Sequence, residues 1–238
     1  MTVLLYALVA ALGNIAGGVA VARGARFGLR LIEGLLALGA GFMLSVTIIE
    51  ILPEAFQRGG HSAALFVLLG YLLVHLSQHT ATQHFHFGEE THQVSQVAGM
   101  SALVGLLLHT FFDGVAIASG FAVSRELGFL LFLAIFLHKL PEGVTISSLQ
   151  IAGGRRPGQA IGSAALLGFA TVVGVLVTDW VSFLSVHGLA LSGGVTLYVA
   201  ASNLVPEFQG KRGWKLPVAF FLGAAAFFVT KELVQATL

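Results

Sequence analysis

The chain has 238 residues, of which 56% are hydrophobic and only 10% charged, and its mean hydropathy is +0.91. Soluble domains carry about 25% charged residues, so these values exclude an ordinary soluble protein and indicate an integral membrane protein. The net charge of +1 gives no reason to expect a nucleic acid partner, and the lack of cysteine excludes disulfides and thiolate metal ligands.

Apolar runs separated by charged or Gly/Pro-rich links predict an all-α fold with eight transmembrane helices. About 20 helical residues cross a bilayer, and runs this long and uniform do not suit membrane β-strands. The first run has no basic region before it, so we expect a retained helix and not a cleaved signal. The expected helices, within one domain of residues 1–238, are 1–22, 31–54, 62–79, 97–122, 127–150, 159–181, 190–209 and 214–236.

Basic residues are concentrated in alternate links. The first, fifth and seventh links hold most of the Lys and Arg residues, whereas the second, fourth and sixth hold only Arg58 and Arg125. Because Lys and Arg in short loops stay cytoplasmic, we expect the odd-numbered links, and the polar segment 78–96, in the cytoplasm. Both termini would then lie outside, with the protein in the plasma (inner) membrane.

A faint internal repeat relates the second and seventh expected helices. These helices are expected to run in opposite directions, so the two copies are inverted. Inverted repeats are a recurring construction of secondary transporters, which place their site at the repeat interface. Gly41, Leu44, Val46, Pro53 and Glu54 recur 153 residues later as Gly194, Leu197, Val199, Pro206 and Glu207.

Two similar polar motifs, HTFFDG at residues 109–114 and HKLPEG at 138–143, interrupt adjacent apolar helices. Positions i and i+4 share a helix face, so His109 with Asp113, and His138 with Glu142, each form half of a site. One such pair is as easily a structural hydrogen bond between helices. Two pairs at mid-span of antiparallel neighbours favour a site for zinc, iron or manganese.

Three further residues of these motifs affect the backbone. Pro141 lies between the two expected ligands of its helix, removes a backbone donor and permits a kink. Gly114 and Gly143 directly follow the two acids. We expect them to leave room for close approach of a backbone or an ion.

The two motifs, together with GFMLSVTIIEILPEAF at 41–56 and GGVTLYVAASNLVPEF at 193–208, resemble the ZIP (Zrt/Irt-like) family of divalent metal transporters. The resemblance covers almost the whole chain. It implies eight helices in a 3+2+3 arrangement with inverted outer repeats, and both termini outside. It also implies uptake of zinc, or of similar ions such as iron, manganese or cadmium, into the cytoplasm, with the metal as substrate and no cofactor.

The resemblance also assigns site residues. The transport site would consist of His109, Asp113, His138 and Glu142, with Met43 as an additional soft ligand. A lone methionine in an apolar helix is more often packing than ligand, so both interpretations of Met43 stay open.

Some family members bind a second metal through an asparagine, an aspartate and a glutamate, whose positions here are Thr110, Lys139 and Thr171. A buried ammonium needs an acidic partner, and Lys139 could pair with Asp113 or Glu142. The hypothesis is therefore a single-metal site in which Lys139 replaces the second ion.

Other polar residues lie towards the ends of the helices. Glu50 and Asp179 are candidate cation attractors at the outer entrance, whereas Glu54 and Glu207 are expected to be solvated acids at helix ends. The cytoplasmic segment is either a metal relay or a polar connection rich in histidine. Its candidate relay residues are His79, His84, His86 and His92.

Three functions compete. A transporter without ATP coupling fits the mid-membrane ligands, since no GxxxxGK[ST] pattern is present. A membrane-embedded zinc-dependent hydrolase would use similar ligands, but HExxH is absent and no spare carboxylate is left as a general base. A metal sensor would need an output domain, for which the chain has little room. The expected partners are metal ions and lipid, with a homodimer left open; an enzyme is not expected.

Overall fold

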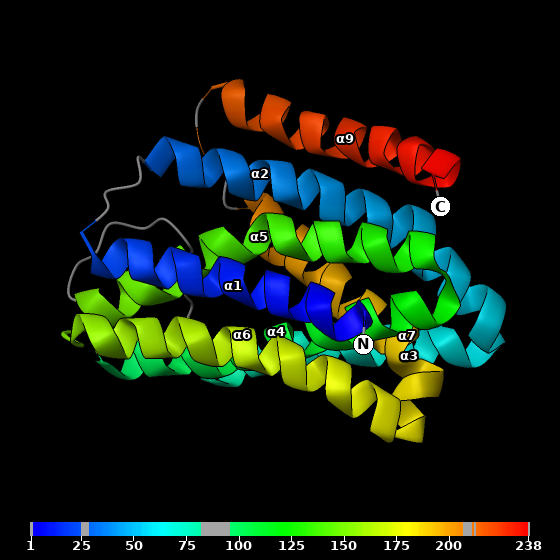
Figure 1. The fold of residues 1–238 in the computed structure, drawn as a ribbon, viewed down its shortest axis with the longest axis horizontal. Helices are drawn as coiled ribbons and strands as arrows, with labels where there is room; N and C mark the ends of the chain where they lie inside the picture. Colours follow the sequence, from blue (N-terminus) through cyan, green and yellow to red (C-terminus); the bar gives the residue numbers. More distant parts are fainter. Residues whose placement is uncertain (1, 25–28, 82–95, 207–210, 212, 238) are drawn as a thin grey trace.

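The computed structural model describes residues 2–24, 29–81, 96–206, 211 and 213–237. These residues form helices lying side by side in a bundle, and no strand occurs among them (Figure 1). The elements are α1 (Thr2–Ala22), α2 (Leu29–Val46), η1 (Thr47–Ile51), α3 (Leu52–Ala81), α4 (Gln96–Val123), α5 (Arg125–Ala152), α6 (Pro157–Trp180), α7 (Ser182–Tyr198), η2 (Val199–Leu204) and α9 (Lys215–Thr237), where η1 and η2 are π-helical.

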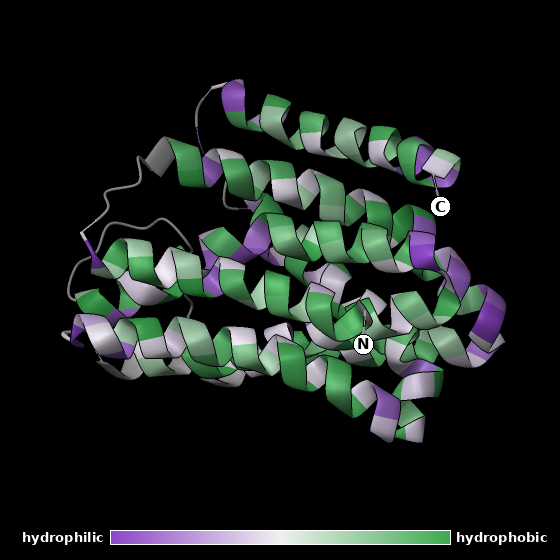
Figure 2. Cartoon of the chain, viewed as in Figure 1, coloured by the Kyte–Doolittle hydropathy of each residue, from purple (hydrophilic) through white to green (hydrophobic). Residues whose placement is uncertain are grey.

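Seven helical segments of this part of the chain are long and apolar enough to cross a membrane, which is the pattern of a multi-pass membrane protein. Apolar residues cover most of the bundle in Figure 2, and polar residues gather towards its ends. One segment, Leu31–Gln78, has 48 residues and contains α2, η1 and most of α3. About 20 residues make one crossing, so this segment is more than twice as long as a single span.

The expected link around residue 60 is a kink and not a loop. Helical structure continues from Leu52 to Ala81, but Gly60 has non-helical angles (φ 54°, ψ −138°). Such a φ suits glycine because it has no Cβ. The position of the break was therefore predicted correctly, whereas the expected loss of helix on both sides of it was wrong.

The sequence also predicts a link between the helices expected at 159–181 and 190–209, containing SVHG at residues 185–188. This is wrong, because α7 already starts at Ser182 and only Val181 separates it from α6. Leu184 is buried, and the His187 ring stacks on Phe66 with centroids 3.9 Å apart. Packing against α3 thus offsets the weak helix propensity of this stretch. Between α4 and α5, the predicted break is confirmed at Ser124, whose Oγ accepts a hydrogen bond from the Leu127 amide at 3.0 Å.

Packing places α5 inside the bundle, in contact with α1, α2, α4 and α6. The other main pairs are α1 with α6, α4 with α6, α3 with α7 and α2 with α9. In Figure 1, α9 lies along one edge of the bundle beside α2. Both polar motifs are on α4 and α5, so the fold holds them in its interior.

The glycines that follow the two acids serve helix packing. A Cβ on Gly143 would collide with the Asn14 backbone of α1, and one on Gly114 would collide with the Thr171 carbonyl of α6. Of the two expected uses, close approach of backbone is the one seen, and it brings α1 and α6 against the site helices.

Candidate metal centre

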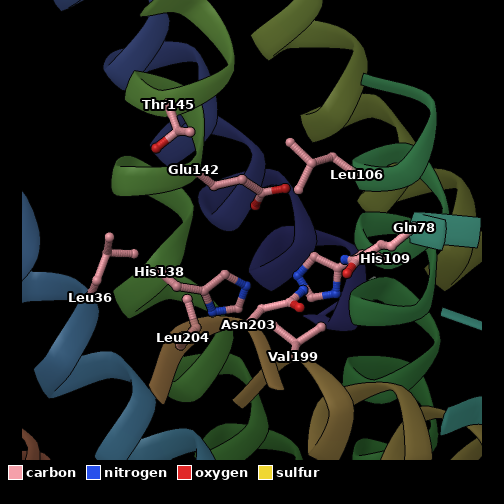
Figure 3. Close-up of a pocket in the computed structure, with 10 residues that line it drawn as sticks. All are labelled: Leu36, Gln78, Leu106, His109, His138, Glu142, Thr145, Val199, Asn203 and Leu204. Carbon is pink, nitrogen blue, oxygen red and sulfur yellow. The ribbon is translucent and has the colours of Figure 1, made fainter. Parts of the chain in front are cut away.

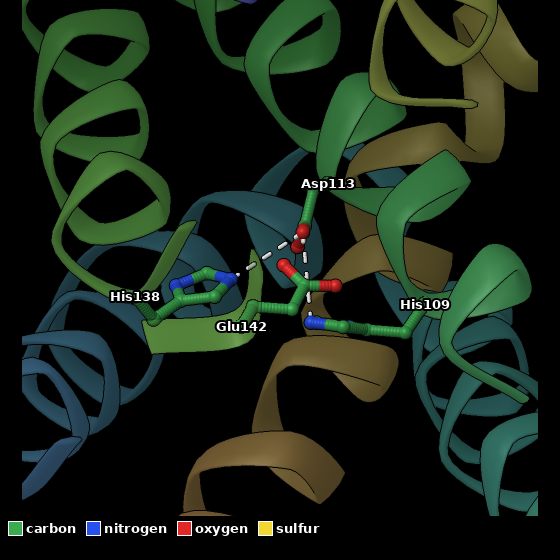
Figure 4. Close-up of side chains that lie close together, drawn as sticks. All are labelled: His109, Asp113, His138 and Glu142. Atoms are coloured by element: carbon green, nitrogen blue, oxygen red, sulfur yellow. Dashed lines mark hydrogen bonds and ion pairs between the residues drawn. The ribbon is translucent and has the colours of Figure 1, made fainter. Parts of the chain in front are cut away.

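Four side chains from α4 and α5 converge in the interior. Each of His109, Asp113, His138 and Glu142 offers one ligand atom, and these atoms all lie within 4.8 Å of one another. All four residues are at most 6% exposed. Figure 4 shows the acids between the two imidazoles, with Asp113 contacting both rings. The i, i+4 spacing in each helix and the antiparallel hairpin around Ser124 account for this convergence.

The geometry around Asp113 suits a small divalent ion. Its Oδ2 atom lies 3.5 Å from His109 Nε2 and 3.4 Å from His138 Nε2. Tetrahedral zinc has bonds of about 2.0–2.1 Å, which place neighbouring ligand atoms about 3.4 Å apart. The two distances from Asp113 Oδ2 to the histidine nitrogens therefore match two edges of such a tetrahedron.

The orientation of His138 is set by its own helix. Nδ1 lies 3.0 Å from the Ala134 carbonyl oxygen, which can only accept, so Nδ1 donates this hydrogen bond. In the neutral ring, Nε2 then carries the lone pair, and it faces a carboxylate oxygen. Either a proton on Nε2 or a metal ion can bridge these two atoms, and a backbone partner of this kind commonly orients metal-binding histidines.

Lys139 makes ion pairs with both acids of the quartet. Its Nζ lies 2.7 Å from Asp113 Oδ2 and 3.0 Å from Glu142 Oε2, and the residue is fully buried. The sequence suggested one acid or the other as its partner; the structure shows both. This leaves Glu142 Oε1 and His109 Nδ1 as buried atoms with no hydrogen-bond partner among the described residues.

A pocket lies beside the quartet, lined by three of its members, and also contacts Gln78 near the end of α3 (Figure 3). Sequence reasoning missed its further polar residues, Gln78, Thr145 and Asn203. Thr145 could have been found, because it lies three residues after Glu142 on the same face. The pocket is lined by Leu36, Gln78, Leu106, His109, His138, Glu142, Thr145, Val199, Asn203 and Leu204.

Three other predicted site residues, Met43, Thr110 and Thr171, are buried. Met43 is fully buried in an apolar cluster of α2, η2 and neighbouring residues. Thr110 is buried, with its hydroxyl donating to the Leu106 carbonyl at 2.9 Å. Thr171 is buried on α6, and its hydroxyl has no partner within the described structure.

The residues expected at the entrance lie away from the quartet. Glu50 lies in η1 and forms an ion pair with Lys231 of α9, with Nζ 2.5 Å from Oε1. Asp179 is exposed near the end of α6, and Glu54 pairs with Arg58 at 2.6 Å. The candidate relay residues His84, His86 and His92, the side chain of His79, and Glu207 lie outside the described residues.

Comparison with known proteins gives consistent results. A family profile described as "ZIP Zinc transporter" matches residues 74–231, which include both motifs. The chain is 26% identical over 200 residues to zinc transporter ZIP13 of Pongo abelii, covering 74% of this chain and 58% of that protein. It is 23% identical over 177 residues to zinc transporter YKE4 of Saccharomyces cerevisiae, covering 63% and 51%.

A third relative, zinc transporter ZIP6 of Homo sapiens, is 28% identical over 135 residues, which are 52% of this chain but only 18% of that protein. The chain thus spans less than two thirds of the length of each of these three relatives. The similarity therefore concerns the helical bundle and its site.

Proposed function

The chain belongs to the ZIP zinc transporter family, and we propose that it carries divalent transition metals across the membrane through the buried His109, Asp113, His138 and Glu142 quartet. One observation supports this most directly: two imidazoles and two carboxylates converge within 4.8 Å in the middle of an apolar bundle. Ionisable groups are costly there and usually mark a transport path.

We propose eight spans in a 3+2+3 arrangement. The 48-residue segment Leu31–Gln78 would cross twice, turning near the kink at Gly60, which adds one span to the seven apolar segments. The central pair would be α4 and α5. Both termini would lie outside the plasma membrane, with ions moving into the cytoplasm. The charge asymmetry of the links supports this orientation, and protease accessibility of terminal tags from the cytoplasmic side would contradict it.

We propose a single-metal site in which Lys139 stands in for a second ion. The ammonium lies 2.7 Å and 3.0 Å from the two acids, where a neighbouring cation would otherwise neutralise them. Thr110 and Thr171 occupy the other second-site positions, and neither is a strong metal ligand. Two metals bound within the bundle of a variant lacking the loop histidines would disprove the proposal, as would unaltered affinity in Lys139→Ala.

Zinc is the first candidate substrate, because the relatives are named zinc transporters. Two nitrogens and two oxygens also suit iron, manganese and cadmium. The family consists of transporters and not enzymes, so the hydrolase is not retained.

Metal uptake into proteoliposomes tests the proposal. Purified protein would be assayed with zinc, iron, manganese and cadmium, and again as His138→Ala. The control is His187→Ala, which removes a histidine of α7 that stacks on Phe66 outside the quartet. We expect uptake by wild type and the control, and its loss in His138→Ala. No uptake of any ion, or equal uptake by all three proteins, would overturn the assignment.

Three further features complete the proposal. The loop histidines at 79, 84, 86 and 92 would act as an exit-side relay, which requires that replacing all four slows uptake. The chain would form a homodimer, which light scattering of the detergent-solubilised protein would contradict by giving a monomer mass. Asp179, at an exposed position near the end of α6, would attract cations, so Asp179→Asn should raise the KM for zinc at low salt.

A further inference from the structure

A helix-contact pattern repeats in the bundle at a spacing of 153 residues. In the α2 and α9 pair, a Cβ on Gly41 would meet the Phe220 carbonyl and one on Gly223 would meet the Leu38 carbonyl. In the α3 and α7 pair, the same reciprocal contacts join Gly194 to the Val67 carbonyl and Gly70 to the Leu191 carbonyl. Each residue of the first pair has a counterpart 153 positions away in the second: 38 with 191, 41 with 194, 67 with 220 and 70 with 223.

The π-helical segments follow the same spacing. A shift of 153 moves η1, Thr47–Ile51, onto residues 200–204, which lie within η2, Val199–Leu204. In Figure 1, α2 and α9 run from left to right, whereas α3 starts at the right-hand end of the bundle. The two halves are therefore related as inverted copies, and each residue of one half has a counterpart near the opposite end of the bundle.

The 153-residue spacing identifies counterparts for the residues that line the pocket. Four of its residues lie on α3 and η2, and their counterparts lie on α9, α2 and η1. Gln78, Val199, Asn203 and Leu204 line the pocket, and their counterparts are Lys231, Val46, Glu50 and Ile51.

The counterparts are more tightly packed in this structure. Val46 and Ile51 are fully buried in an apolar cluster with residues of α5, α7 and α9, whereas Val199 and Leu204 keep 4% and 6% exposure and line the pocket. Glu50 and Lys231 lie beside them at the edge, with side chains 21% and 26% exposed, and they pair with each other. The wall formed by α3 and η2 thus lines a pocket and carries two amides. The equivalent wall, formed by α2, η1 and α9, is packed shut and carries an ion pair.

We propose that Val46, Glu50, Ile51 and Lys231 form the wall of a second vestibule, opening to the opposite face of the membrane, in which Glu50 binds the incoming divalent cation in competition with Lys231. The inference rests on the proposed transport function and deepens it. When access alternates in transporters built from inverted repeats, one helix group moves against the other around the site, so we expect the packed wall to open as the pocket wall closes. The path then passes a carboxylate whose ammonium partner acts as a tethered competitor for the cation.

Competition between Lys231 and the metal for Glu50 predicts opposite changes in the KM for zinc uptake when either residue is replaced. Removing the ammonium leaves Glu50 free for the metal, so Lys231→Met should lower the KM for zinc uptake about fivefold, the effect of losing one partly exposed ion pair. Glu50→Gln should raise the KM. In a Glu50→Gln background, the fall in KM caused by Lys231→Met should be at least about twofold smaller, because the carboxylate for which the lysine and the metal compete is gone.

The control is Lys211→Met. Lys211 pairs with Glu33 of α2 at 2.6 Å with similar exposure, but it lies before α9 and not in the vestibule wall. An equal fall in KM for Lys211→Met would show that the effect comes from the change in net charge and not from competition at Glu50, and it would overturn the proposal. An undiminished fall in KM on adding Lys231→Met to Glu50→Gln would also overturn it.

Thiol labelling tests the vestibule without metal, and the cysteine-free chain gives no background. Leu204→Cys and Ile51→Cys are counterparts, and Ser182→Cys is an exposed positive control. A membrane-impermeant thiol reagent should label Leu204→Cys from one face of the membrane and Ile51→Cys, more slowly, from the other. Labelling of both from the same face, or of Ile51→Cys from neither while Ser182→Cys reacts, would overturn the vestibule. If labelling follows expectation but wild type takes up no metal, the vestibule stands and the transport function fails.

Discussion

Replacing Lys139 by methionine tests the role of the buried ammonium. The substitution keeps an unbranched apolar side chain, shorter by only the terminal nitrogen, and removes the charge that pairs with Asp113 and Glu142. Both carboxylates are at most 6% exposed, so bulk water solvates them poorly once the partner is lost. Loss of one member of a buried ion pair costs about 3–5 kcal/mol. For a chain of this size that corresponds to a fall in Tm of roughly 6–20 °C.

Metal should reverse this loss in the variant more than in wild type. In Lys139→Met the two acids can bind a second cation in the place of the ammonium, so zinc should stabilise the variant more strongly and bind with a stoichiometry of two. Thermal unfolding in detergent with and without zinc, combined with metal analysis after gel filtration, measures both effects. Lys211→Met is the matched control, because its ion pair is partly exposed and should contribute less than about 1 kcal/mol. A Tm for Lys139→Met equal to that of the control, or one zinc per chain in every variant, would refute the role assigned to the lysine.

Three other predictions concern the packing and the ligand set. Gly143→Ala should lower Tm by several degrees, because the added Cβ would lie within 2.8 Å of α1 backbone carbons and overpacking costs about 1–3 kcal/mol. Gly162→Ala, which meets nothing within 4 Å, should leave Tm near wild type, and equal unfolding of the two variants would contradict the packing role. Met43→Leu should leave the ratio of cadmium to zinc uptake unchanged, since a buried apolar cluster surrounds this side chain; a fall in that ratio would make it a ligand. Lys139→Asp combined with Thr171→Glu should bind two metals per chain by equilibrium dialysis, and a single bound metal would count against the second-site positions.

The convergence of His109, Asp113, His138 and Glu142 follows from spacings that are local in the sequence. His109 with Asp113, and His138 with Glu142, had to share helix faces because residues four apart always do. The single-residue break at Ser124 then makes α4 and α5 antiparallel neighbours. Since both steps depend on residues close in the chain, the convergence of the four candidate ligands could be predicted from the sequence.

Features that depend on distant contacts could not be predicted in this way. The SVHG stretch is helical because His187 packs on Phe66, more than a hundred residues earlier. The second acidic partner of Lys139 depends on the rotamers of a closed core. Likewise, the pairing of Glu50 with Lys231 joins positions 181 residues apart. No periodicity in the sequence indicates which side chain crosses such a distance.

The sequence by itself predicted a multi-pass membrane protein, most of its helices and the convergence of four candidate ligands, because hydropathy and helical periodicity are local properties. Only the tertiary structure decided that Lys139 bridges both acids, that the glycines after the acids press on α1 and α6, and that the pocket reaches Gln78 and Asn203. The lysine bridge depends on side-chain rotamers within the α4–α5 hairpin. The glycine contacts and the pocket arise from close packing between helices that are remote in the chain.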